Sequence, residues 1–289
     1  MAFQDGILKV KGTLGGITFM KTADGYIARM KGGVDGSRIK TDPKFERVRE
    51  NNAEFGRAGK ASKVLRKAFR SLIRGLADSR ATSRMVTLFM QALKTDEVSL
   101  RGERTVTAGE PGFLQGFEFN NRVRLETSFV APYTVTIDRA TGQASVAIPA
   151  FNPSQVIAAP PGATHCRIVS GVAKIDFEAE TYVGATGASA DIDLRTAQQL
   201  AINMPTLVGP GSALPIFVAL GIEFYQQVNT RLYGLSNGAF NALSIVAVDS
   251  GDGAARVASA SEVVNTEDVQ EPAVQEAPKE NPKLTIVTE

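Results

Sequence analysis

The fold is organised around residues 53–76, which read AEFGRAGKASKVLRKAFRSLIRGL. Apolar side chains recur three or four positions apart from Ala61 to Leu76, which is the spacing of one helix face. Cations occupy most of the opposite face, and the candidate interaction face is Arg57, Lys60, Lys63, Lys67, Arg70 and Arg74. The pattern predicts an amphipathic helix with a basic side.

Charge is distributed unevenly around this helix. The chain of 289 residues has a formal net charge of +2. Residues 1–80 hold 18 Lys and Arg against 8 Asp and Glu, a difference of +10, whereas residues 249–289 hold 3 against 9, a difference of −6. The basic end is suited to nucleic acid, to an acidic protein surface, or to the acidic end of another copy.

The segment before the helix predicts an N-terminal β-hairpin. β-prone runs lie on either side of Ala23-Asp24-Gly25, and Asp-Gly tolerates the positive φ of a tight hairpin turn. Residues 31–40, KGGVDGSRIK, have the composition of a polar linker. Thr41 or Asp42 with Pro43 then favours a helix start, and Asn51-Asn52 and Gly56 favour a break or kink before the basic helix.

The hairpin motif carries a resemblance. The stretch GTLGGITFMKTADGYIAR resembles the N-terminal motif of a family of uncharacterised Bacteroidota proteins, and the matching positions are Gly12, Gly16, Ile17, Phe19, Gly25, Tyr26 and Arg29. The resemblance implies a C-terminal β region after the motif and brings no activity with it. The strongly basic helix and the acidic tail depart from the family pattern.

After the basic helix, the sequence predicts a second helix and then strands. Met85, Val86, Phe89, Met90 and Leu93 form one apolar face within residues 82–94, which completes a helical hairpin. From residue 98 the period becomes that of strands, with turn residues between short β-prone runs. We therefore expect a mainly β, α+β protein with a β-sandwich of Ig-like or jelly-roll type.

Individual strands are expected in eight segments. These are residues 98–109, 112–120, 122–129, 133–148, 165–183, 188–194, 214–229 and 241–248. FVALGIEF, residues 217–224, is apolar at both alternating sets of positions, which predicts a strand buried on both faces or one covered by the helices.

Four regions follow from these patterns. They are an N-terminal hairpin arm and linker (1–40), a basic helical hairpin (41–97), a β-sandwich region (98–248) and an acidic tail (249–289). Residues 249–283 have the composition of a disordered tether, and the β-prone run that follows is a candidate for strand addition to a sheet edge. Its candidate residues are Leu284, Thr285, Ile286 and Val287.

Residue types that carry catalysis are sparse. His165 and Cys166 are the single histidine and the single cysteine, and as strand neighbours they point to opposite faces. Asp191 and Asp193 share one strand face, either as a solvated face or as part of an acid pair or cation site. Phosphate-loop and dinucleotide-binding motifs are absent. We expect no enzyme activity, cofactor, metal or membrane partner.

A structural role is the leading prediction from the sequence. The expected protein assembles with copies of itself into a filament, tube, shell or phage-like particle, through charge-complementary and β-addition contacts. The alternative is a nucleic-acid-binding protein that uses residues 57–74 on phosphates. The N-terminus resembles no signal peptide and no run of 18 apolar residues exists, so we expect the protein in the cytoplasm or in a particle assembled there.

Overall fold

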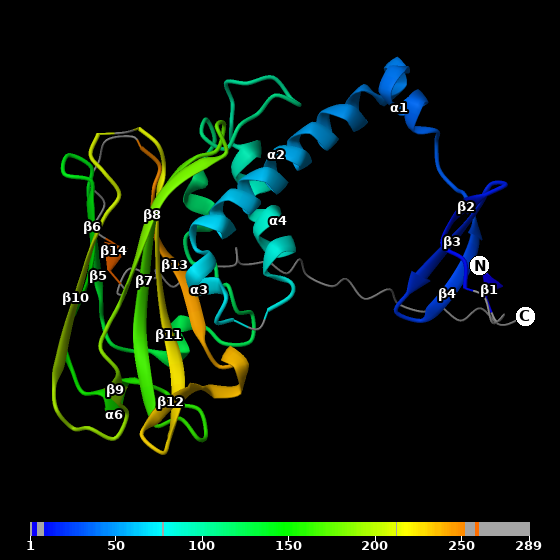
Figure 1. Ribbon diagram of the computed structural model, residues 1–289. Coiled ribbons are helices and arrows are strands. Elements are labelled where there is room, and N and C mark those ends of the chain that lie inside the picture. The colour runs from blue at the N-terminus through cyan, green and yellow to red at the C-terminus, as the bar shows by residue number, and fades with distance from the viewer. Residues whose placement is uncertain (1, 5–8, 77, 212, 252–257, 260–289) are drawn as a thin grey trace, which may run out of the picture.

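The computed structural model describes residues 2–4, 9–76, 78–211, 213–251 and 258–259. It confirms the α+β class predicted from the sequence. A small N-terminal sheet stands at one end, two main helices follow, and two antiparallel sheets form the body of the protein (Figure 1).

The N-terminal sheet has four strands: β1 (Ala2–Phe3), β2 (Gly12–Leu14), β3 (Ile17–Thr22) and β4 (Gly25–Met30). Their order is β1-β4-β3-β2, and all neighbours are antiparallel. The hairpin forms as predicted, but Thr22 pairs with Gly25, so its two-residue turn is Ala23-Asp24 and not the expected Asp24-Gly25. Gly25 has a φ of 122°, a conformation that glycine adopts without the steric cost of a side chain.

The expected linker between sheet and helices is partly helical, which corrects the prediction. Helix α1 covers Gly36–Thr41, and the Asp35 carboxylate accepts a hydrogen bond from the Ser37 backbone N–H at its start. A single turn, η1 (Pro43–Phe45), follows, and Asp42 caps it through the Lys44 N–H. Asp35 therefore supplies a helix start within a stretch whose glycines favoured a linker.

The basic helix begins earlier and ends earlier than predicted. Helix α2 runs unbroken from Glu46 to Ala68, through the predicted break, and the short α3 (Arg70–Ile73) follows. Phe69 separates the two with φ −98° and ψ 19°, and its ring packs edge-on against Phe119 at 6.3 Å between centroids. The turn at Phe69 is fixed by burial of this ring, which is 1% exposed.

Helix α4 (Ala81–Lys94) is the predicted second helix. Met85, Phe89 and Leu93 are fully buried against α2, and the other two residues of the predicted face are partly buried. The two helices form the expected hairpin, and together they cover one face of the larger sheet (Figure 1).

Two antiparallel sheets face each other in the body. One contains β5 (Thr134–Asp138), β6 (Gln143–Phe151), β10 (Leu200–Leu207) and β14 (Ala258–Ser259), in the order β10-β6-β5-β14. The other contains β7 (His165–Asp176), β8 (Thr181–Ala188), β9 (Ile192–Asp193), β11 (Ile216–Val228), β12 (Arg231–Gly234) and β13 (Ala242–Asp249). Its order is β12-β11-β7-β8, with β13 paired to β11 and β9 to β7.

Strand β11 divides two apolar cores, as its sequence predicts. Val218 and Leu220 face the core between the two sheets, whereas Phe217 and Ala219 face the core beneath the helices. All four side chains are fully buried. The larger sheet is therefore the middle layer, with the second sheet on one side and the helical hairpin on the other.

The strands expected between residues 98 and 129 are wrong. That region holds turns, η2 (Pro111–Leu114) and α5 (Leu125–Ser128), and its β pairing is limited to two isolated bridges, Glu118 with Ser244 of β13 and Phe129 with Ile157. Asp96 organises the start of this region by accepting from the backbone N–H groups of Val98, Ser99 and Thr105. These bonds fold the chain back at the positions where a strand would have to extend.

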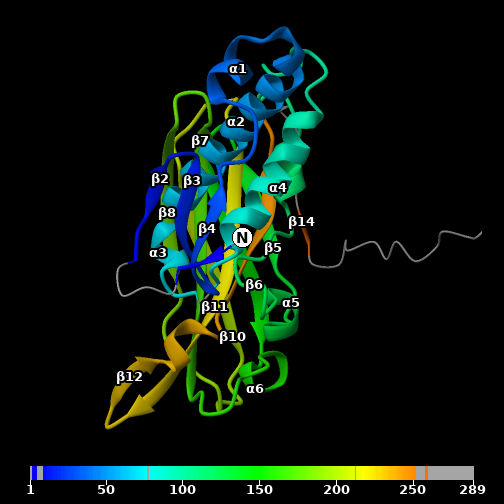
Figure 2. The same ribbon diagram turned by 90° about the vertical axis from the view of Figure 1, so that its right-hand side faces the viewer.

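Other strands also differ from the predicted ones. The segment 188–194 yields only the two-residue β9, and β10 and β12 were not predicted. Short helical turns occur at α6 (Pro153–Val156) and η3 (Leu235–Gly238). Figure 2 shows β12 projecting beyond the lower end of the sheet. Its residues are mostly exposed, so burial imposes no apolar pattern by which the sequence could predict this strand.

Candidate interaction surfaces

Two of the six candidate cations are engaged in contacts within the protein. Arg57 donates to the backbone oxygens of Gly102 and Arg104, and so ties α2 to the loop after α4. Lys60 Nζ lies 2.7 Å from the Glu180 carboxylate in the loop between β7 and β8. These two side chains join α2 to the rest of the body, so they are less available for a partner than their spacing in the sequence indicated.

The other four cations, Lys63, Lys67, Arg70 and Arg74, are exposed and make no ion pair within the described part of the chain. Lys63 and Lys67 lie on α2, and Arg70 and Arg74 lie at and beyond the turn at Phe69. The pKa of Glu180 is lowered by its hydrogen bond with Lys60 and by the charges of Lys60, Lys63 and Lys67. Lys63 and Lys67 are therefore within electrostatic reach of Glu180, the residue that precedes β8.

Strand β8 forms an edge of the larger sheet beside these lysines. It pairs only with β7 among the described strands, and seven of its eight residues are exposed. The sequence TYVGATGA contains no charged residue and no proline. These are residue types that usually prevent another strand from pairing with a sheet edge. Tyr182 and Val183 are 43% and 55% exposed.

The direction of the free backbone groups on β8 follows from two hydrogen bonds of β7. Ser189 N donates to Ile168 O, and Ile175 N donates away from β8, to Pro215 O. Because bonding and non-bonding pairs alternate along an antiparallel ladder, the N–H groups of Tyr182, Gly184 and Thr186 point to the outer side. A strand laid along this edge would meet a regular series of donors and acceptors.

The N-terminal sheet presents an open apolar face. Leu14, Ile17 and Met30 are direct cross-strand neighbours, and their exposed fractions are 76%, 37% and 74%. Phe19 and Ala28 form the next row on the same face. Ile27 is the one described residue of this sheet that is buried, and neither apolar core includes a residue before Ala58.

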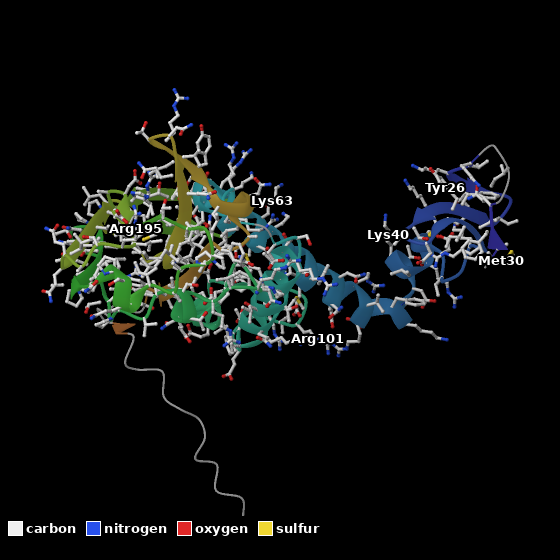
Figure 3. The ribbon with its side chains drawn as sticks, turned by 90° about the horizontal axis from the view of Figure 1, so that it is seen from below. Tyr26, Met30, Lys40, Lys63, Arg101 and Arg195 are labelled. Atoms are coloured by element: carbon white, nitrogen blue, oxygen red, sulfur yellow. The ribbon has the colours of Figure 1, made fainter. Side chains whose placement is uncertain are left out.

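This sheet stands apart from the two cores of the body (Figure 1). Figure 3 shows Met30 on the sheet at one end of the molecule, Arg195 at the other end, and Lys63 on the surface between them. The exposed apolar row of this sheet has no covering layer among the described residues, whereas the apolar face of a sheet is usually buried against another element. The candidate tail residues Leu284, Thr285, Ile286 and Val287 lie outside the described residues.

A cavity of about 550 Å³ lies between α4 and the loop that follows η2. Glu118 lines it; Oε1 accepts from the Leu125 N–H at 3.1 Å, whereas buried Oε2 has no hydrogen-bond partner. Burial raises the pKa of Glu118 to about 7, against the lowering effect of the Leu125 N–H. Glu118 therefore titrates near neutral pH, a property that its sequence context did not indicate.

The remaining candidate groups are engaged separately. The His165 imidazole contacts the Thr164 hydroxyl, and burial raises the pKa of the Cys166 thiol to about 12. Asp191 pairs with Arg167, and Asp193 pairs with Arg195, so the two aspartates do not meet as an acid pair. No group of three or more metal-ligating side chains occurs within the described ranges.

Two further findings bear on the class of protein. Within the described part of the chain, no helix is both long and apolar enough to cross a membrane. Comparison with family models, curated proteins and solved structures finds no match. The arrangement is thus that of a layered α+β body with a free basic surface, a bare sheet edge and an uncovered N-terminal sheet.

Proposed function

We propose that this protein is a structural subunit that assembles with copies of itself. The observation that carries the proposal is the apolar face of the N-terminal sheet, with Leu14, Ile17 and Met30 in register and open to solvent. The assembled form is a filament, tube, shell or phage-like particle, in which apolar sheet contacts combine with charge-complementary and strand-addition contacts between neighbouring copies.

A second copy of the same sheet fits this face. Sheets stack face to face about 10 Å apart, and an apolar face is buried most completely by another apolar face. The strands have two to six residues, and with a spacing of about 4.8 Å and a rise of about 3.4 Å per residue the face covers roughly 300 Å², so one stacked pair buries roughly 600 Å². That area is below the roughly 1,200 Å² of a stable interface, so this contact is reversible and needs further contacts to hold an assembly.

The test compares two charge insertions in the full chain. Leu14→Asp with Met30→Asp places two charges in the apolar row, whereas the control Val98→Asp with Leu100→Asp places them on apolar residues that are 90% and 74% exposed in the body. Light scattering and electron microscopy should show that the first pair disperses the assembly and the second does not. Equal assembly of both variants would contradict the proposal.

A second function is favoured by a different observation: Lys63, Lys67, Arg70 and Arg74 remain exposed after the chain folds. Such a cluster neutralises phosphates, and no aromatic side chain among these residues would read bases. In this alternative the protein binds nucleic acid without sequence preference. Duplex and single-stranded oligonucleotides should bind with an affinity that falls steeply with salt. Binding that survives charge reversal at Lys63, Lys67 and Arg70 would exclude this surface.

A further inference from the structure

We infer that the outer edge of β8, with Lys63 and Lys67 beside it, binds the C-terminal segment 260–289 of a neighbouring copy as an added strand. This inference rests on the proposed self-assembly and gives it a specific second contact. It uses a surface on the body that is separate from the N-terminal sheet. The two contacts can therefore be tested independently.

The backbone of β8 offers unpaired hydrogen-bonding groups along its outer edge. The outward N–H groups of Tyr182, Gly184 and Thr186 have no partner on β7, because the ladder directs the alternate residues inward. Each outward N–H and C=O is a strong hydrogen-bonding group that an extended peptide can satisfy. Because β8 has no charged residue and no proline, its edge lacks these two features that usually prevent pairing with an added strand.

Charge identifies the occupant. Lys63 and Lys67 act on Glu180 at the start of β8, and Lys60 is already paired with that carboxylate. Residues 260–289 contain 7 Asp and Glu against 2 Lys, a difference of −5, and include the β-prone run LTIV at 284–287. This segment therefore combines negative charge with the strand-forming residues that the edge requires.

Chain connectivity favours a neighbouring copy over the same chain. Ser259 lies in β14, at the edge of its sheet opposite β10. A Cβ at Gly187 of β8 would lie 3.9 Å from the Met204 Cβ of β10, so β8 is adjacent to β10. The segment of the same chain would thus have to pass around the second sheet to reach its own β8. We therefore assign the edge to the segment of a neighbouring copy, and the disulfide experiment below tests the same-chain alternative.

The first experiment measures binding of a labelled synthetic peptide of residues 260–289 to the full chain by fluorescence anisotropy. Lys63→Glu with Lys67→Glu should weaken binding at least tenfold. The matched control, Lys44→Glu with Lys94→Glu, reverses the same number of charges at exposed sites away from β8 and should change binding less than twofold. Absence of binding, or equal loss in both variants, would overturn the inference.

Changes in the peptide test the strand geometry without affecting the fold of the protein. Backbone N-methylation at Leu284 and Ile286 removes donors on one edge of the added strand, and N-methylation at Thr285 and Val287 removes them on the other. One pair should abolish binding and the other should leave it within about threefold, because only one edge faces β8. Equal effects of the two pairs would contradict strand addition.

Disulfide trapping tests which copy supplies the segment. Full chains with Val183→Cys are mixed with full chains carrying Ile286→Cys, while the native Cys166 stays buried. A disulfide-linked pair of chains is expected on a non-reducing gel. A third chain carries both substitutions. If its disulfide forms within one chain while the mixture gives no linked pair, the assignment to a neighbouring copy is overturned. Loss of trapping in chains that still assemble would contradict this contact and leave the proposed self-assembly standing.

Discussion

Lys60 on α2 and Glu180 at the start of β8 form an ion pair with 2.7 Å between Nζ and Oε1. The pair joins the basic helix to the hairpin whose outer strand is a free sheet edge. It also uses one of the cations that the sequence assigned to a partner. The basic surface available to a partner is therefore shorter than the predicted ridge and begins at Lys63.

Glu180→Gln should have a small effect on stability. Both side chains are substantially exposed, at 65% and 39%, and exposed ion pairs contribute about 1 kcal/mol or less. Urea unfolding should show a small loss of stability that shrinks further in 0.5 M salt. A loss as large as that of a buried apolar truncation would mean that this pair holds α2 on the sheet, which the buried apolar contacts are expected to do instead.

Gly171 in β7 should not tolerate a larger residue. A Cβ at this position would lie 2.8 Å from Leu72 Cδ1 and 3.0 Å from Phe69 Cδ1, which is closer than side chains pack. Gly171→Val should lower the free energy of unfolding by about 1–3 kcal/mol through overpacking. The control is Gly59→Ala, at a position in α2 where a Cβ meets no atom within 4 Å, and it should leave stability unchanged or raise it. Reversal of this order in thermal melts would contradict the packing of α3 on β7.

Asp96 should give the protein an acid-dependent stability. Burial alone would raise its pKa, but hydrogen bonds from Ser99, Thr105 and Val98 outweigh burial and lower the pKa from 3.8 to about 2. A lowered carboxylate pKa stabilises the fold above the unfolded value, and the contribution is lost as the pH falls from about 4 to about 2. Asp96→Asn should cost roughly 2 kcal/mol at pH 7 by this linkage, and the difference from the natural chain should shrink below pH 4. A pH-independent difference would contradict the assignment.

Glu118 should have the opposite pH dependence. Burial raises its pKa from 4.5 to about 7, so the folded chain holds a proton that the unfolded chain releases between pH 4.5 and 7. The contribution of Glu118 to stability should therefore fall as the pH rises through that window. Glu118→Gln should be more stable than the natural chain at pH 8 and nearly equal to it at pH 4.5. Thermal melts across this range measure the difference, and an equal gain at both pH values would contradict the shifted pKa.

Strong periodic signals allowed the main elements to be predicted. The apolar spacing of the helices, the hairpin around Asp24 and the double-sided apolar run 217–224 all correspond to observed elements. Each of these signals records burial of one or both faces, and burial is what holds the corresponding element in place. The layered order of helices and sheets follows from them.

The errors arose where contacts distant in the sequence decide the local structure. The break expected at Gly56 is absent because Glu54 and Arg57 fix this turn of α2 against residues 102–104. The β-prone residues after 98 fold into turns because the Asp96 carboxylate accepts hydrogen bonds from three backbone N–H groups. The bare edge of β8 and the raised pKa of Glu118 depend on strand order and burial, which no local pattern in the sequence contains.

The central claim is self-assembly, and sedimentation velocity of the natural full chain over a concentration series at low salt tests it most directly. The account predicts species heavier than the 30.7 kDa monomer, with a share that grows as the concentration rises. A single species at the monomer mass, from the lowest to the highest concentration, would contradict it.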